Sequence, residues 1–251
     1  MNILVCIKRV PATGGKMTLT PDEQEIDTRY LGFTISPHEE CAVEEAIQLI
    51  EKHGGSTAVL TLGPAIAEEQ LRDAMAMGIE RAVLLETDGR EWDPGATAAA
   101  IVEAVRAQAA PVDLLLLGNE SADAGNYQVG IRVAHALGWP CVTGIKALEI
   151  KGSTAVAKRE VSGGWEIYEI LLPAVVMVKE GINLPRYPSL PGRLKAKKKP
   201  VDRVQPQGRE ASLEKVRLKL PSEQEHQVEI LGKGPEAASR VIEILQRLGA
   251  V

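Results

Sequence analysis

The sequence predicts an α/β fold in which antiparallel strands extend a doubly wound, mostly parallel sheet, followed by an extended C-terminal arm. Three observations support this prediction. Apolar runs of strand length alternate with segments of helical period over residues 2–138. Residues 146–180 instead hold alternating apolar stretches separated by Gly and Ser turns. Beyond Gly181 the chain is Pro-rich and basic and then polar, with too few apolar residues for a second core.

The first strand is expected at 2–10, which is short, β-branched and apolar until its charges begin. A helix is expected at 38–55, because acidic residues occupy its first turn, apolar residues recur with helical period, and two glycines end it. A buried strand at 57–63 comes next. A helix at 65–78 then ends at a glycine and leads to another strand at 81–87.

The alternation continues with a helix at 93–108, where Asp93 is placed to cap the helix before Pro94. A four-leucine strand at 112–119, a loop at 118–130 and a helix through 131–138 complete the pattern. This order is typical of a Rossmann-like sheet of the adenine-nucleotide-binding type. We therefore expect an α/β nucleotide-binding domain at 1–182, an extended arm at 183–234 and a C-terminal helix at 235–251.

Composition and charge exclude several classes of protein. The chain has 251 residues and a formal net charge of −5, so it can bury a core of its own and does not favour nucleic acid. No apolar run approaches the ~18 residues of a membrane span, and the N-terminus lacks the pattern of a secretory signal or transit peptide. Its three cysteines lack metal-ligand spacing, which indicates a reducing compartment and inert thiols, with a redox or ligand-contact role for one of them as the alternative. We expect a cytoplasmic protein, or a mitochondrial matrix protein in a eukaryote, without membrane insertion.

Ligands of open parallel sheets bind beyond the carboxyl ends of the strands. The loop at 118–130 follows such a strand, holds Asn, Glu, Ser and Asp side chains between glycines, and leads into a helix N-terminus suited to an anion. The alternative is a well-capped loop with no ligand. His38 opens a helix at the same edge, where it either contacts a ligand or is solvated at the helix start.

Sequence motifs for catalysis are missing. The chain has no GxGxxG after the first strand, no P-loop and no GxSxG, and its histidines show no HExxH grouping. A nucleotide pocket without catalytic residues or a metal site points to a binding or carrier protein.

Several segments together resemble the β subunits of electron transfer flavoprotein. The match runs from ILVCIKRVP at the N-terminus through DLLLLGNESAD to KREVSGGWEIYEILLPAVVMV and NLPRYPSLPGRLKAKKKP, and the last two blocks carry most of the specificity. The resemblance implies a heterodimer with an α subunit that holds most of an FAD. It also implies a second nucleotide in this chain, either AMP or, in electron-bifurcating members, a second FAD.

By position, the resemblance places the nucleotide contacts on the following residues: Cys6, Ser36, Pro37, His38, Glu39, Leu62, Gly118, Asn119, Glu120, Ser121, Ala122, Asp123, Ala124, Gly125, Asn126, Tyr127, Gln128 and Val129. The sequence departs from the family at Ser36-Pro37-His38, which replaces Asn-Pro-Phe, so His38 is expected to approach the flavin. It also departs at Ala124-Gly125-Asn126-Tyr127, which replaces a run such as Gly-Asp-Thr. AMP, FAD and an empty site all remain open.

Residues 186–200 carry six Lys or Arg and no acidic residue. A nucleic-acid tail, a solvated linker and a recognition loop are the alternatives, and only the loop explains Leu190 held between Pro188 and Pro191. The resemblance implies that this loop, with Tyr187, Pro188, Leu190 and Pro191, docks flavin dehydrogenases. The lysines that follow would contact the α subunit or acidic partner surfaces.

The resemblance thus implies an electron carrier, not an enzyme, that takes electrons from flavin dehydrogenases, such as the acyl-CoA dehydrogenases of fatty acid β-oxidation, to a membrane quinone oxidoreductase. Arg159 and Glu160 are either a polar link to the α subunit or an exposed cross-strand pair. The alternative function is a stand-alone domain that binds or hydrolyses an adenine nucleotide.

Overall fold

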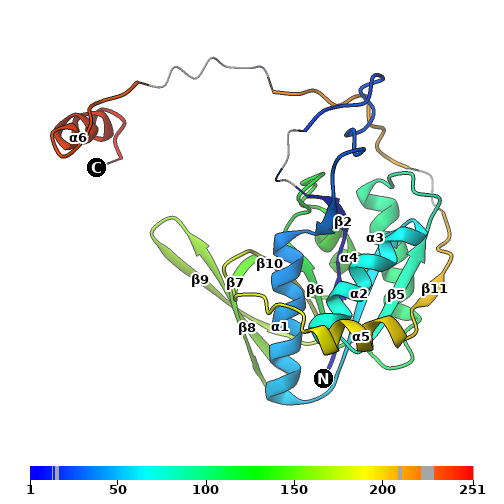
Figure 1. The fold of residues 1–251 in the computed structure, drawn as a ribbon. Helices are drawn as coiled ribbons and strands as arrows, with labels where there is room; N and C mark the ends of the chain where they lie inside the picture. Colours follow the sequence, from blue (N-terminus) through cyan, green and yellow to red (C-terminus); the bar gives the residue numbers. More distant parts are fainter. Residues whose placement is uncertain (13, 15–16, 209–210, 222–228, 251) are drawn as a thin grey trace. The chain divides into compact units, whose positions relative to one another are not determined.

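The computed structural model describes residues 1–12, 14, 17–208, 211–221 and 229–250. The chain forms two compact units, Met1–Leu218 and Lys219–Val251, which are described separately. Within the described residues of the first unit, a nine-stranded sheet has the order β11-β5-β4-β1-β6-β10-β7-β8-β9 (Figure 1). The predicted fold class, a doubly wound and mostly parallel sheet with added antiparallel strands, is confirmed.

The strands of this sheet are β1 (Asn2–Cys6), β4 (Ser56–Gly63), β5 (Arg81–Glu86), β6 (Leu114–Gly118), β7 (Cys141–Lys151), β8 (Thr154–Val161), β9 (Gly164–Leu171), β10 (Ala174–Val178) and β11 (Asp202–Val204). Two short strands, β2 (Arg9–Pro11) and β3 (Phe33–Ile35), pair antiparallel in a separate sheet. The first predicted strand is therefore divided, since β1 ends at Cys6 and the chain leaves the main sheet before Arg9.

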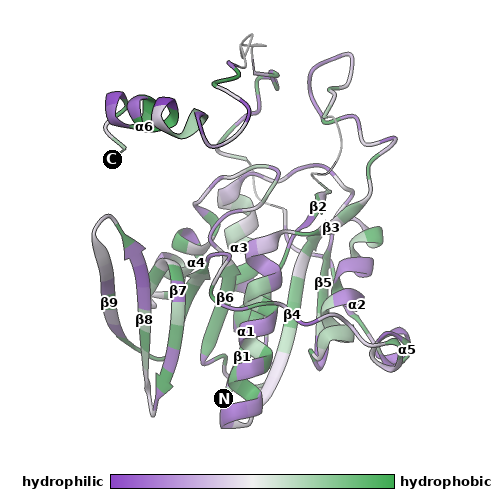
Figure 2. Cartoon of the chain, turned by 60° about the vertical axis from the view of Figure 1, so that its left-hand side comes forward, coloured by the Kyte–Doolittle hydropathy of each residue, from purple (hydrophilic) through white to green (hydrophobic). Residues whose placement is uncertain are grey.

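Helices cover both faces of the sheet. They are α1 (Pro37–His53), α2 (Glu68–Met77), which follows a 3₁₀ turn at Ala65–Ala67, α3 (Pro94–Arg106) and α4 (Val129–Leu137). Side chains of a strand point alternately to its two faces. Ile3 and Val5 accordingly pack with α1 and α2, whereas Leu4 and Cys6 pack with α3 and α4. The central strands are mostly hydrophobic because both of their faces are buried (Figure 2).

The LPAVV segment departs from the prediction of a purely antiparallel addition. β7, β8 and β9 are antiparallel, but β10 returns to the middle of the sheet and runs parallel to both β6 and β7. All five residues of β10 are buried. A fully apolar run is typical of a central parallel strand, so β10 fits this place better than an edge.

The arm that was expected to be extended contains regular structure. Residues Leu190–Lys198 form α5, and β11 adds a parallel strand beside β5. Ser189 caps α5, because its hydroxyl oxygen accepts the Gly192 N–H at 3.1 Å. At the other end, Arg72 of α2 donates to the backbone carbonyl of Ala196 at 2.5 Å, and Ala196 is buried. The basic loop is thus a capped helix that packs on α2.

The second unit contains α6 (Ala237–Arg247), within the C-terminal helix expected at 235–251; Val251 lies outside the described residues. Over the part of the chain that the structure describes, no helix combines the length and apolarity that crossing a membrane requires.

Candidate functional site

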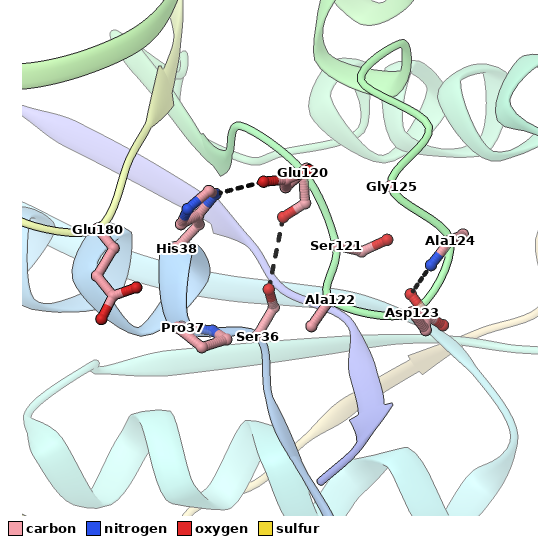
Figure 3. A pocket seen from close by; sticks show the side chains of 10 residues that line it. All are labelled: Ser36, Pro37, His38, Glu120, Ser121, Ala122, Asp123, Ala124, Gly125 and Glu180. Atoms are coloured by element: carbon pink, nitrogen blue, oxygen red, sulfur yellow. Dashed lines mark hydrogen bonds and ion pairs between the residues drawn. The ribbon is translucent and has the colours of Figure 1, made fainter. Parts of the chain in front are cut away.

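A pocket of about 340 Å³ lies at the carboxyl edge of the parallel strands (Figure 3). The start of α1 forms one wall, and the loop after β6 forms another. The lining residues are Ser36, Pro37, His38, Glu120, Ser121, Ala122, Asp123, Ala124, Gly125 and Glu180. Nine of these ten were predicted as nucleotide contacts, and they come from two segments that are far apart in sequence.

Close packing of α1 against the end of β6 holds the two walls together. A Cβ atom on Gly118 would lie 2.7 Å from Cγ of Glu39 and 3.1 Å from Cβ of His38, so only glycine fits there. The Ser36 hydroxyl also donates to the backbone carbonyl of Glu120 at 3.4 Å. Gly118 therefore serves the shape of the pocket without lining it.

Lys8 connects Glu39 of α1, which is buried next to His38, to Asp123 in the loop after β6. Its backbone N–H donates to the Glu39 carboxyl at 2.6 Å, and its ammonium group pairs with Asp123 at 2.6 Å. Burial raises the pKa of Glu39 to about 8, although the Lys8 N–H opposes this. Burial also opposes ionisation of Asp123, but the charge and hydrogen bond of Lys8 hold the pKa of Asp123 below its usual value.

His38 lies between two carboxylates, Glu120 and Glu180 (Figure 3). Its Nδ1 is 3.9 Å from the Glu120 carboxylate and is buried, with no hydrogen-bond partner among the residues that the structure describes. Burial lowers the pKa of His38, while the two carboxylates act in the opposite direction. The imidazole is thus predominantly neutral at neutral pH and has an unused polar atom.

The other predicted contacts do not line the pocket. Cys6 is buried in the core on the α3 and α4 side, where burial raises its pKa, and Leu62 packs against the same cluster. Glu39 is buried beneath the pocket. Four residues precede or begin α4 outside the lining: Asn126, Tyr127, Gln128 and Val129.

Two further predicted contacts, Asn119 and Tyr127, have a defined backbone hydrogen bond or backbone conformation. The Asn119 N–H donates to the Val178 carbonyl at 2.8 Å, which ties the loop to β10. Tyr127 has a positive φ of 56° and is exposed at the start of α4. A positive φ is uncommon for an aromatic residue, so the loop holds Tyr127 in a strained turn.

Sequence reasoning missed Lys8 and Glu180. Lys8 follows β1 at the same edge as the other loops, and this position was the available signal. Glu180 follows β10, whose place in the middle of the sheet was not predicted. Across the described residues, no group of three or more His, Cys, Asp or Glu side chains is arranged to hold a metal ion.

Arg159 and Glu160 lie on opposite faces of the β8–β9 hairpin, since successive strand residues alternate. Arg159 bonds Glu166 at 2.5 Å and also contacts the Tyr168 hydroxyl, whereas Glu160 pairs with Lys146 at 2.5 Å.

The predicted docking residues lie at the start of α5 or just before it. They are Tyr187, Pro188, Leu190 and Pro191, and the Leu190 side chain is 72% exposed.

Comparisons with known proteins agree over almost the whole chain. A family model described as "Electron transfer flavoprotein domain" matches residues 25–207. A protein of Bacillus subtilis (strain 168), named "Electron transfer flavoprotein subunit beta", is 37% identical over 255 residues, covering 98% of each chain. Proteins with the same name from Syntrophomonas wolfei and Mycobacterium tuberculosis (strain ATCC 25618 / H37Rv) are 37% and 38% identical. They cover 88% and 80% of this chain, and 86% and 77% of their own lengths.

Proposed function

This chain belongs to the electron transfer flavoprotein family as a β subunit, and on that premise we propose that it works in a heterodimer as an electron carrier between flavin dehydrogenases and a membrane quinone oxidoreductase. The resemblance seen in the sequence is thereby confirmed. One observation carries the proposal. Two segments 84 residues apart, at Ser36 and Glu120, meet in a pocket at the ligand-binding edge of the sheet.

The residues of the pocket fit the adenosine part of a nucleotide. A volume of about 340 Å³ lies within the range of small-molecule sites. Its carboxylates, Glu120, Asp123 and Glu180, are hydrogen-bond acceptors that suit ribose hydroxyls and an amino group. They do not suit a phosphate, which would be better placed at the free N–H groups that begin α4. AMP and FAD share this adenosine part, so both remain in the proposal.

The flavin is the redox-active group of the proposed carrier. FAD, held mainly by the α subunit, supplies the electron-transfer chemistry when it is bound. His38 is the residue of this chain that we propose to face it, with its unpartnered Nδ1 available as a hydrogen-bonding atom. In this proposal the chain helps to orient the flavin through His38, and it performs no bond-breaking step.

Partner dehydrogenases, for which acyl-CoA dehydrogenases are the proposed example, dock on Tyr187, Pro188, Leu190 and Pro191. Support comes from the exposure of Leu190 and Tyr187 beside a basic helix. One apolar anchor is worth about 1–3 kcal/mol, which suits an encounter whose partners must separate again. Replacing Leu190 by Ala is expected to slow reduction by the dehydrogenase several-fold without loss of FAD; unchanged kinetics would contradict the anchor.

The α subunit is proposed to cover the outer face of the β8–β9 hairpin. Glu160 shares this face with Trp165, Ile167 and Leu171, which are all exposed although they are large and apolar. Exposed apolar side chains on the last strand of a sheet are typical of an interface. Arg159, on the other face, would hold the hairpin together through Glu166 and Tyr168.

We propose that this β subunit acts in the cytoplasm, or in the mitochondrial matrix of a eukaryote.

The experiment is to express the chain alone and together with its α subunit, and to measure visible absorbance and released nucleotides. We expect a yellow heterodimer with one FAD and one AMP, or with two FAD if the protein bifurcates electrons. A stable colourless monomer that hydrolyses ATP would contradict the proposal and favour a stand-alone nucleotide-binding domain.

A further inference from the structure

The docking segment comprises residues 187–191. The four residues before it, 183–186, lie along α1, and the first and last of them bond to this helix. At the first end, the Asn183 side-chain amide donates to the carbonyl of Cys41 and to the carboxylate of Glu45, both at 3.0 Å. Both acceptors belong to α1. The chain therefore leaves β10 and is attached at once to the helix that also forms a wall of the pocket.

The second attachment is Arg186, which binds two carboxylates of α1. Its Nε and Nη2 donate to the two oxygens of Glu44 at 2.9 and 3.0 Å. Its Nη1 and Nη2 donate to the two oxygens of Glu51 at 2.7 and 3.0 Å. The backbone N–H of Arg186 adds a further bond to Glu44 at 3.1 Å. Glu44 and Glu51 lie on the same side of α1, about two turns apart.

This arrangement depends on a guanidinium group. Glu44 is buried with 3% exposure, and burial alone would raise its pKa, but the hydrogen bonds from Arg186 and Gln48 hold the pKa below its usual value. The same two carboxylates raise the pKa of Arg186. The planar fork of arginine can bind both carboxylates at once, whereas the ammonium group of lysine is a single point charge.

The next residues are those proposed to meet partners. Tyr187 is 97% exposed and Leu190 72% exposed, so packing of their own side chains contributes little to fixing their positions. After Leu190 the chain is held again, because Gly192 packs on the backbone of Ala76 in α2. The docking segment, residues 187–191, therefore lies between two fixed points, Arg186 on α1 and Gly192 on α2.

We propose that Arg186 is a positioning residue for partner docking: through Glu44 and Glu51 it fixes the start of the docking segment, so that Tyr187 and Leu190 are presented in one arrangement. Holding exposed residues in their bound arrangement lowers the entropy cost of association. This inference rests on the proposed docking function of Leu190. It assigns Arg186 no contact with the flavin or the nucleotide.

The test compares three variants of the heterodimer with its wild type. Arg186→Met removes both ion pairs, and Glu51→Gln weakens the exposed pair while Glu44 stays neutralised. Arg203→Met is the matched control, because Arg203 also joins two carboxylates, Glu68 at 2.6 Å and Glu86 at 3.0 Å, but lies on β11. The assay follows reduction of the heterodimer, at varied concentration, by a substrate-reduced acyl-CoA dehydrogenase that reduces the wild type.

For Arg186→Met we expect KM for the heterodimer to rise about ten-fold, with kcat and FAD content unchanged, and for Glu51→Gln a rise of about three-fold. Amide hydrogen exchange should quicken at Gly192 and Arg193, whose N–H groups bond Ser189. An unchanged KM in both variants would overturn the proposal. An equal rise in Arg203→Met, or a joint loss of kcat and FAD, would also overturn it, because either result indicates general destabilisation.

The Leu190→Ala variant separates this proposal from the function on which it rests. If Leu190→Ala raises KM and Arg186→Met does not, docking at Leu190 stands and the positioning role of Arg186 is wrong. If neither variant changes KM although the heterodimer carries electrons, the docking segment itself is wrong.

Discussion

Glu39 is a carboxyl group enclosed beneath the pocket, and its environment favours the protonated form. Burial raises its pKa from 4.5 to about 8. The unfolded chain therefore loses this proton at a lower pH than the folded chain does. The stability that the protonated group contributes is fully present below pH 4.5 and is lost as the pH rises towards 8.

Replacing Glu39 by Gln should accordingly flatten the fall in stability above pH 5. The amide is isosteric and stays uncharged, and its oxygen can still accept the Lys8 N–H. We expect similar urea midpoints for wild type and variant at the acidic end of this range. Near pH 8 the variant should be more stable by roughly 4 kcal/mol, because the rise of the pKa from 4.5 to about 8 is worth ~1.4 kcal/mol for each pKa unit. Parallel pH profiles would show that Glu39 is ionised in the folded state.

At the scale of residues, the sequence could predict which segments form the pocket but not how each side chain is used. Ser36–His38 and Glu120–Gly125 follow from strand topology together with the family pattern, and the structure brings them together. Cys6, at the end of β1, and Glu39, next to His38, were predicted as contacts in the same way, yet both are buried. Side-chain direction at a strand end depends on local twist and packing, which one sequence does not specify.

At the scale of elements, the sequence analysis missed helix α5. Two prolines and a run of lysines favour an extended arm by composition, but Pro191 is at the second position of the helix, where its missing N–H costs nothing. Ser189 before it is a suitable N-cap, and this signal was available in the sequence. What could not be foreseen is the contact with α2, which buries Ala196 and satisfies carbonyl groups at the C-terminal end of α5.

The contact between α5 and α2 depends on Gly192. A Cβ atom there would lie 2.5 Å from the carbonyl oxygen of Ala76, so Gly192→Ala should displace α5 and cost about 1–3 kcal/mol of stability. Thermal unfolding and amide exchange at Arg193 would measure both effects. Gly208→Ala is the matched control, since no atom of the described residues lies within 4 Å of its added Cβ. If the two variants behave alike, the close approach of α5 to α2 is wrong.

For the whole molecule, the alternation of apolar runs predicted the parallel sheet and its two helical layers, because that pattern follows directly from burial of both sheet faces. The place of β10 did not follow, since strand order depends on long-range pairing. Its insertion between β6 and β7 leaves β9 as the last strand at one end of the sheet. Trp165, Ile167 and Leu171 are exposed on one face of β9.

The exposed face of β9 predicts how the chain depends on its α subunit. Ile167 is 61% exposed, so Ile167→Asp should hardly change folding of this chain, but it should weaken the heterodimer by roughly 1–3 kcal/mol, the value of one buried apolar side chain. Sedimentation of the coexpressed subunits over a dilution series would measure the change. Val204→Asp, on β11 at the opposite end of the sheet and 46% exposed, is the control and should leave the affinity unchanged. Equal affinities for wild type and Ile167→Asp would place the α subunit on another surface of this chain.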